Sequence, residues 1–249
     1  MLKFLRISFA VLMILSALTV NSWALSVYVM SAGEGQDNQA ILNTLRAAGH
    51  DPILGVDPSE WDGSQADLSE YDVVVLSLAI AELPQDMPKD GQVALISYVQ
   101  QGGGLVTGER LVWLIYNNVW FQDLDLIIPV KSMSGRFVAE TATKYRQVKK
   151  KTDPILNNGL PSDFTFSTAD IAGSESLFLG KKGATTYYRT SADGKLILRT
   201  SGVVGWKKES GRVISFSTLF THIELSDINY ATLFVNAVEW AGSSGADSD

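Results

Sequence analysis

The chain has 249 residues, a formal net charge of −7 at neutral pH and no cysteine, and 46% of its residues are hydrophobic. The lack of cysteine excludes disulfides, thiolate metal sites and thiol nucleophiles. The acidic balance disfavours nucleic acid, which is bound through clustered Lys and Arg, and we interpret the short basic run Lys149–Lys151 as a solvated loop. The length suits a single domain with one core.

The first residues have the pattern of a secretory signal peptide. Lys3 and Arg6 precede an apolar run over 7–20, and Ser22-Trp23-Ala24 supplies small residues for cleavage after Ala24. Removal of 1–24 takes away two positive charges, so the net charge becomes −9. We expect a secreted or periplasmic domain over 25–241, with no membrane contact after cleavage and a flexible tail over 242–249. An uncut anchor is the alternative, because the apolar run extends to about nineteen residues when it is counted through Leu25.

From residue 25 onward, short apolar runs alternate with amphipathic segments, which is typical of strands connected by helices in a parallel sheet. The pattern predicts strands at 25–30, 53–56, 73–78 and 105–107, and helices at 37–48 and 88–101, with Asp37 and Gly49 capping the first helix. After Gly135 the segments are β-rich. Strands are expected at 137–141, 176–179, 185–190, 195–200 and 212–217, with a turn at Asp193-Gly194 and a last helix at 228–241.

Several of these segments occur in an order typical of a known family. They are 71–76 (YDVVVL), 98–106 with the glycine run 102–104, 153–161 (DPILNNGLP), 211–216 (GRVISF) and 236–240 (NAVEW). In this order and spacing the chain resembles the class I glutamine amidotransferase-like superfamily, and within it the ThuA-like (trehalose utilisation) branch. The resemblance implies a flavodoxin-like three-layer α/β sandwich with a mainly parallel sheet, a β-rich C-terminal insert and a site at the strand carboxyl ends.

The resemblance also places Glu109 where amidotransferases carry their catalytic cysteine, on the turn after strand 105–107. Glutaminase chemistry is therefore excluded, and the histidine that ThuA-like relatives often have at this turn is absent too. On an exposed elbow Glu109 could act as a general base, accept a sugar hydroxyl or bind a metal. It could equally be a surface residue paired with Arg110. Thr107, Gly108 and Arg110 are expected to contact a ligand beside it.

The two histidines receive different interpretations. His222 follows strand 212–217, close to where the family places a histidine, and could share a cleft with Glu109 as an acid/base couple. Hydrogen bonding near the site is the alternative. His50 follows the end of the first helix, and we expect it at the surface.

The loop after the first strand is a second candidate for ligand binding. It contains Gly33, Glu34, Gly35, Gln36 and Asp37, and small residues before a helix start allow close approach of a ligand. A dinucleotide fingerprint completed by Asp57 is disfavoured, because Asn38 replaces its third glycine and two acidic side chains would repel a pyrophosphate. A tight turn without ligand is the remaining alternative. No cofactor and no metal site are expected.

Aromatic residues follow the candidate elbow. Trp113, Tyr116, Trp120 and Phe121 could stack on a sugar, but their spacing places them on one helical face, so we expect them in the core.

We therefore expect an exported protein without glutaminase activity that binds a small polar ligand, with a carbohydrate as one candidate. The alternatives are a hydrolase or isomerase acting on such a ligand through Glu109 and His222, and a protein-interaction module with a vestigial site and the β-rich 135–200 region as its contact surface.

Overall fold

A computed structural model describes residues 24–78, 85–117, 119–138, 141–169, 175–190 and 200–243 of the chain. The expected signal segment up to residue 23 and the Asp193-Gly194 turn lie outside these ranges. So do residues 195–199 of the strand expected at 195–200 and residues 244–249 of the tail expected at 242–249. In the described ranges, every helix is too short or too polar to cross a membrane.

The first half of the chain alternates strands and helices. Its elements are β1 (Ser26–Ser31), α1 (Gly35–Ala47), β2 (Asp51–Leu54), β3 (Val73–Ser77), α2 (Lys89–Gln100), β4 (Gly104–Thr107) and α3 (Glu109–Tyr116). The second half contains β5 (Val130–Val138), β6 (Ala142–Gln147), β7 (Asp163–Ser167), β8 (Glu175–Gly180), β9 (Thr185–Thr190), β10 (Ser201–Lys208), β11 (Gly211–Phe216) and α4 (Ile228–Gly242).

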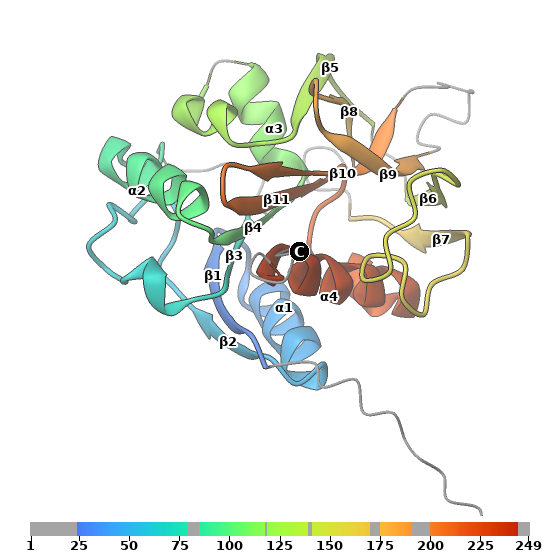
Figure 1. Cartoon of the computed structure of the whole chain (residues 1–249), viewed down its shortest axis with the longest axis horizontal. Coiled ribbons are helices and arrows are strands. Elements are labelled where there is room, and N and C mark those ends of the chain that lie inside the picture. The colour runs from blue at the N-terminus through green and yellow to red at the C-terminus, as the bar shows by residue number, and fades with distance from the viewer. Residues whose placement is uncertain are drawn as a thin grey trace, which may run out of the picture.

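The strands join one sheet in the order β2-β1-β3-β4-β11-β10-β9-β6-β7, and β5 and β8 form a ribbon attached to β10 (Figure 1). The five strands from β2 to β11 are parallel, as the sequence predicts. The other pairings are antiparallel. The sheet as a whole is therefore mixed rather than mainly parallel. The strands of the β-rich second half extend the sheet beyond β11.

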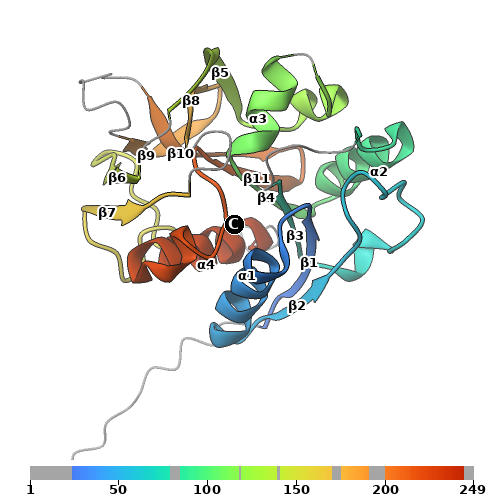
Figure 2. The same ribbon diagram turned by 180° about the vertical axis from the view of Figure 1, so that it is seen from behind.

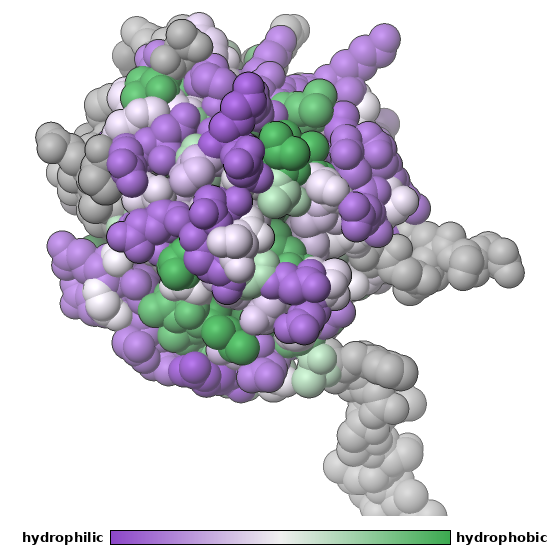
Figure 3. All heavy atoms as spheres, turned by 90° about the vertical axis from the view of Figure 1, so that its left-hand side faces the viewer, coloured by the Kyte–Doolittle hydropathy of each residue, from purple (hydrophilic) through white to green (hydrophobic). Residues whose placement is uncertain are grey.

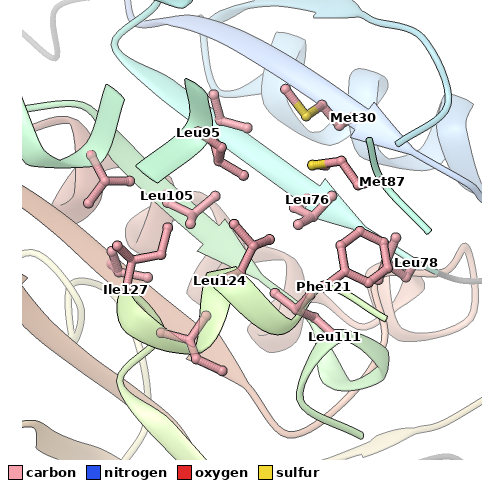
Figure 4. Packing of buried hydrophobic residues seen from close by; sticks show 14 of the residues in the cluster. Met30, Leu76, Leu78, Met87, Leu95, Leu105, Leu111, Phe121, Leu124 and Ile127 are labelled. Carbon is pink, nitrogen blue, oxygen red and sulfur yellow. The ribbon is translucent and has the colours of Figure 1, made fainter. Parts of the chain in front are cut away.

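Both faces of the inner parallel strands β1, β3, β4 and β11 are buried. Val27 and Val29 belong to a hydrophobic cluster that α1 and α4 complete, whereas Tyr28 and Met30 belong to a second cluster that α2 and α3 complete. Figure 2, from behind, shows α1 and α4 on one side of these strands and α3 on the other. Figure 4 shows the second cluster, in which β1, β3 and β4 side chains meet Leu95 of α2. Burial on both faces explains why the β1 and β3 sequences are continuously apolar.

Three local expectations differ from the structure. Glu34, rather than Asp37, is the N-cap of α1, and Asp37 is buried in its first turn. His50 is 5% exposed rather than at the surface, and burial lowers its pKa. Helix α3 ends at Tyr116, so the aromatic residues after it do not share a helical face.

Because α3 ends at Tyr116, the four aromatic residues differ in how deeply they are buried. Phe121 is buried and takes a left-handed conformation with φ 60°, and Trp113 and Trp120 pack against the same cluster as Phe121. Tyr116 is 49% exposed. Core packing is thus confirmed for Phe121 and in part for the two tryptophans, but not for Tyr116.

The segment between β2 and β3 is held by a repeated local contact. The pattern Asp-x-Ser occurs at 57, 62 and 67, and each aspartate accepts hydrogen bonds from the backbone N–H and the hydroxyl of the serine two residues later, at 2.6–3.0 Å. Such contacts favour turns over regular structure. Asp57, the residue considered for a ribose, therefore serves this turn.

Candidate functional site

The parallel strands end at one edge of the sheet with small polar residues. β1, β3 and β4 end at Ser31, Ser77 and Thr107, and all three side chains are buried. Thr107 Oγ1 lies 2.7 Å from Ser215 Oγ of β11, whereas Ser77 Oγ has no hydrogen-bond partner in the described part of the chain. This carboxyl edge is where open α/β sheets bind ligands.

At this edge, Asp37 and His222 form a close pair. The Asp37 carboxylate accepts the backbone N–H of His222 at 2.8 Å, and its Oδ1 lies 2.6 Å from His222 Nδ1. The Asp37 side chain is 3% exposed, but the His222 side chain is 44% exposed. A carboxylate at Nδ1 fixes the orientation and the tautomer of an imidazole. Nε2 of His222 has no partner among the described residues, so it is available to a ligand.

The loop between β1 and α1 is closed by its own side chains. Ser31 Oγ accepts the backbone N–H of Gly33 at 3.0 Å and bonds Asn38 Oδ1 at 2.5 Å, while Asn38 Nδ2 donates to the carbonyl of Gly33 at 3.2 Å. Asn38, which breaks the dinucleotide pattern, thus stabilises a tight turn. The next three residues, Glu34, Gly35 and Gln36, are exposed beside the Asp37–His222 pair.

Glu109 is the first residue of α3, directly after β4 and Gly108, as the glycine run predicts. Its surroundings differ from the expected exposed elbow, because the residue is 3% exposed and its carboxylate accepts a hydrogen bond from Ser176 Oγ of β8. Its backbone N–H donates to Thr218 at 3.0 Å. Burial, opposed by Ser176 and Arg110, raises the pKa of Glu109 to about 7. Such a carboxyl can hold or release a proton near neutral pH.

A second buried carboxylate lies close to Glu109. Glu175, 1% exposed, accepts hydrogen bonds from Thr143 Oγ1 at 2.8 Å and from Ser217 Oγ, and its charge contributes to the raised Glu109 pKa. The network continues through Tyr145, whose hydroxyl lies 3.0 Å from Ser217 Oγ and 2.9 Å from Thr218 Oγ1.

Sequence reasoning missed this network. Its hydroxyl and carboxyl groups come from β6, from β8 and from the segment after β11, which are distant in the chain. The one local signal is the polar pair Glu175-Ser176 at the start of the otherwise apolar β8.

The structure gives Glu109 and His222 different partners. Glu109 bonds Ser176 and His222 bonds Asp37, and in the described part of the chain no hydrogen bond joins the two. Arg110 is buried, with its guanidinium 4.9 Å from the centre of the Trp113 ring. The two predicted catalytic residues thus belong to two separate arrangements at the same edge, the pair at α1 and the network at α3.

Neither arrangement has the composition of a metal centre. Among the described residues, no group of three or more His, Asp or Glu side chains could hold a metal ion.

Comparisons with known proteins identify the class of fold. No protein-family model and no curated protein matches the chain. Solved structures do, and they define an α/β protein with a ThuA-like, glutamine amidotransferase-like fold.

Three of these structures illustrate the likeness. A protein described as ThuA-like from Parabacteroides merdae has a TM-score of 0.62 at 14% identity, over 91% of this chain and 93% of its own. A cytoplasmic protein from Salmonella typhimurium LT2 has a TM-score of 0.63 at 14% identity, over 87% and 99%. A protein described as part of a GMP synthase, from Thermoplasma acidophilum, has a TM-score of 0.56 at 15% identity, over 89% and 96%. At this identity the likeness shows a shared fold and no activity.

Proposed function

We propose that this protein is exported and binds a small polar ligand of the carbohydrate class at the carboxyl edge of its parallel strands, around His222. The observation that supports the proposal best is the pairing of a buried Asp37 with a half-exposed His222. The pair holds an imidazole in a fixed orientation with one nitrogen available, and such a nitrogen donates to or accepts from a ligand hydroxyl.

The remaining parts of the edge agree with a polar ligand. Ser77 brings a buried hydroxyl without a partner in the described chain, and the Gly33–Gln36 loop offers backbone groups beside the N-terminus of α1. Arg110, Thr107 and Gly108 are less suited to direct contact, because all three are buried. We infer that these three residues hold the carboxyl edge in place by packing beneath it and do not contact the ligand. We also infer that the parallel half is a flavodoxin-like three-layer sandwich, since helices complete a hydrophobic cluster on each face of its strands.

A ligand screen tests this proposal. The mature chain 25–249 would be titrated with neutral sugars, beginning with glucose and trehalose, by ligand-observed NMR and calorimetry. We expect binding that His222→Ala abolishes and that Asp37→Asn weakens by roughly tenfold, since a hydrogen bond to a charged group contributes about 1.5–3 kcal/mol. Asp62→Asn, which removes an exposed carboxylate from another part of the chain, is the control and should bind as the natural protein does. Unchanged binding by His222→Ala would contradict the proposal.

A second candidate function is catalysis, as a hydrolase or isomerase on the same class of ligand. It is supported by the pKa of Glu109, which lies near neutrality at the same edge of the sheet, because catalytic acids and bases have pKa values near the working pH. The reaction would use His222 as the group that touches the substrate, with Asp37 orienting it. Turnover of any bound sugar that Glu109→Gln slows without loss of binding would favour this candidate. If neither sugar binding nor turnover depends on Asp37, His222 or Glu109, the protein-interaction module becomes the favoured function.

Export is supported by the N-terminal sequence. Lys3, Arg6, the apolar run and Ser22-Trp23-Ala24 together have the pattern of a cleavable signal. The Salmonella typhimurium LT2 neighbour, in contrast, is described as cytoplasmic, and at 14% identity its likeness to this chain concerns the fold alone.

A further inference from the structure

A hollow in the described part of the molecule lies away from the candidate site. It has a volume of about 770 Å³ and is bounded by the segment 61–72 on one side and by α2 on the other. Asp72 and Gly103, which line it, directly precede β3 and β4, so the hollow is at the amino edge of the sheet. Its volume is within the range of small-molecule sites. Figure 3 shows the side of the molecule on which α2 lies, covered mostly by hydrophilic residues with apolar patches between them.

The lining of this hollow is negatively charged and favours cationic ligands. Asp67 and Asp72 line it, and no Lys, Arg or His of the described chain does. Hydrogen bonds from the Ser69 hydroxyl and N–H hold the pKa of Asp67 below its usual value, so this carboxylate stays ionised in neutral and mildly acidic solution. Two carboxylates without a lining cation repel phosphates, sulfates and acidic sugars and attract cations.

Each carboxylate still has one oxygen available. Asp67 Oδ1 accepts from Ser69, and Asp72 Oδ2 accepts the N–H and the hydroxyl of Ser26 at 2.8 and 3.0 Å. The other oxygen of each carboxylate has no hydrogen-bond partner among the described residues. These two oxygens can therefore accept hydrogen bonds from a ligand, and an ammonium group has three N–H donors.

The rest of the lining is suited to hydroxyl groups and ring surfaces. Ser97 and Gln101 of α2 contribute a hydroxyl and an amide, and Tyr71 and Tyr98 contribute aromatic rings. Tyr98 is fixed, because its hydroxyl donates to the carbonyl of Tyr71 at 3.2 Å. Aromatic rings attract an ammonium group through their negative faces and also pack on the CH groups of sugars.

We propose that this hollow is a second binding site, for a small ligand that carries a primary ammonium group together with several hydroxyl groups, as an amino sugar does. The assignment is independent of the function proposed for the carboxyl edge. The ammonium group lies between the free oxygens of Asp67 and Asp72, and the hydroxyl groups face Ser97 and Gln101.

Matched ligands test the proposal in the natural protein. Glucosamine, N-acetylglucosamine and glucose would each be titrated into the mature chain 25–249 at pH 6 by calorimetry, at about 20 mM and about 300 mM salt. Glucosamine should bind at least severalfold more tightly than the other two, and salt should reduce that preference, because added ions screen exposed charges. Equal binding of N-acetylglucosamine, which has the same ring without the charge, would overturn the proposal, and so would the absence of glucosamine binding.

Substitutions then locate the site. Asp67→Asn and Asp72→Asn should each weaken glucosamine binding by about two- to fivefold, and the double variant by on the order of tenfold, as for exposed ion pairs. Asp57→Asn is the matched control, because Asp57 makes the same contact with a serine two residues later but does not line the hollow. His222→Ala should leave glucosamine binding unchanged, which separates this site from the carboxyl edge. Unchanged affinity in the double variant would overturn the assignment, and if that variant fails to fold, the ligand series and its salt dependence in the natural protein decide.

Discussion

Replacement of Glu109 by Gln should change how the stability of the protein depends on pH. The ordinary pKa of a glutamate is 4.5, and burial raises the pKa of Glu109 to about 7 in the folded protein. Below pH 4.5 both the folded and the unfolded chain hold this proton, so Glu109 imposes no penalty. Between pH 4.5 and 7 only the folded chain keeps it, and the free energy of unfolding falls as the pH rises.

The size of the effect follows from that interval. At about 1.4 kcal/mol for each pH unit, the interval from 4.5 to about 7 corresponds to a loss of about 3 kcal/mol, complete above pH 7. A glutamine has nearly the same shape and can accept the Ser176 hydrogen bond, but it has no charge to bury. We therefore expect Glu109→Gln to gain about 3 kcal/mol of stability over the natural protein between pH 4 and pH 8.5.

Urea unfolding of both proteins at several pH values measures this difference. Titrating groups without a contact to Glu109, such as His50 and Glu239, are common to both proteins and cancel. Glu60→Gln, at an exposed position outside the helices, is the control and should differ from the natural protein by no more than about 0.5 kcal/mol at each pH. A difference between Glu109→Gln and the natural protein that stays flat from pH 4 to pH 8.5 would refute the reasoning, because it would mean that folding does not raise the pKa of Glu109.

Three further predictions concern other parts of the chain. Gly211→Ala should destabilise the protein by about 1–3 kcal/mol in urea unfolding, since an added Cβ would lie 2.1 Å from the Val99 carbonyl, whereas Gly35→Ala, with nothing within 4 Å, should be neutral or slightly stabilising. His50→Gln should lessen the loss of stability on acidification. Burial lowers the pKa of His50, so this residue contributes stability that is present above pH 6.5 and is lost as the pH falls below 6.5. Equal acid sensitivity of the variant and the natural protein in urea unfolding would count against this prediction. N-terminal sequencing of protein recovered from outside the cytoplasm should begin at Leu25, and recovery of the intact Met1 form in membranes would instead indicate an anchor.

The parallel half of the fold could be predicted because its signals are local. Continuous apolar runs such as 73–77 indicate strands covered on both faces, and glycines such as Gly49, with φ 87°, mark helix ends. The antiparallel half of the sheet was harder to predict from the sequence. β6 and β7 mix charged and apolar residues, β6 in the sequence ATKYRQ, and their position in the sheet depends on pairing with each other and with β9.

The candidate site could be predicted only in part. The glycine run located Glu109 at the start of α3, and the end of β11 located His222 at the same edge. The 33–37 loop and His222 were expected at one cleft, and the contact between Asp37 and His222 agrees with that. The individual hydrogen bonds could not be predicted, because Ser176 is 67 residues from Glu109 and Asp37 is 185 residues from His222. Burial of Glu109 and of His50 depends equally on such distant segments, which explains why both were expected at the surface.

The edge strand β2 limits how far the sheet can extend. The N–H groups of Asp51 and Gly55 donate inward to β1, so within β2 the N–H groups that face outward belong to positions 52 and 54. Position 52 is a proline, which has no N–H, and Leu54 alone remains as an outward donor in this strand. A second chain that approached this edge would find too few donors for a regular ladder, even though Ile53 and Leu54 are exposed there. By removing an outward N–H donor, Pro52 disfavours edge-to-edge aggregation through β2.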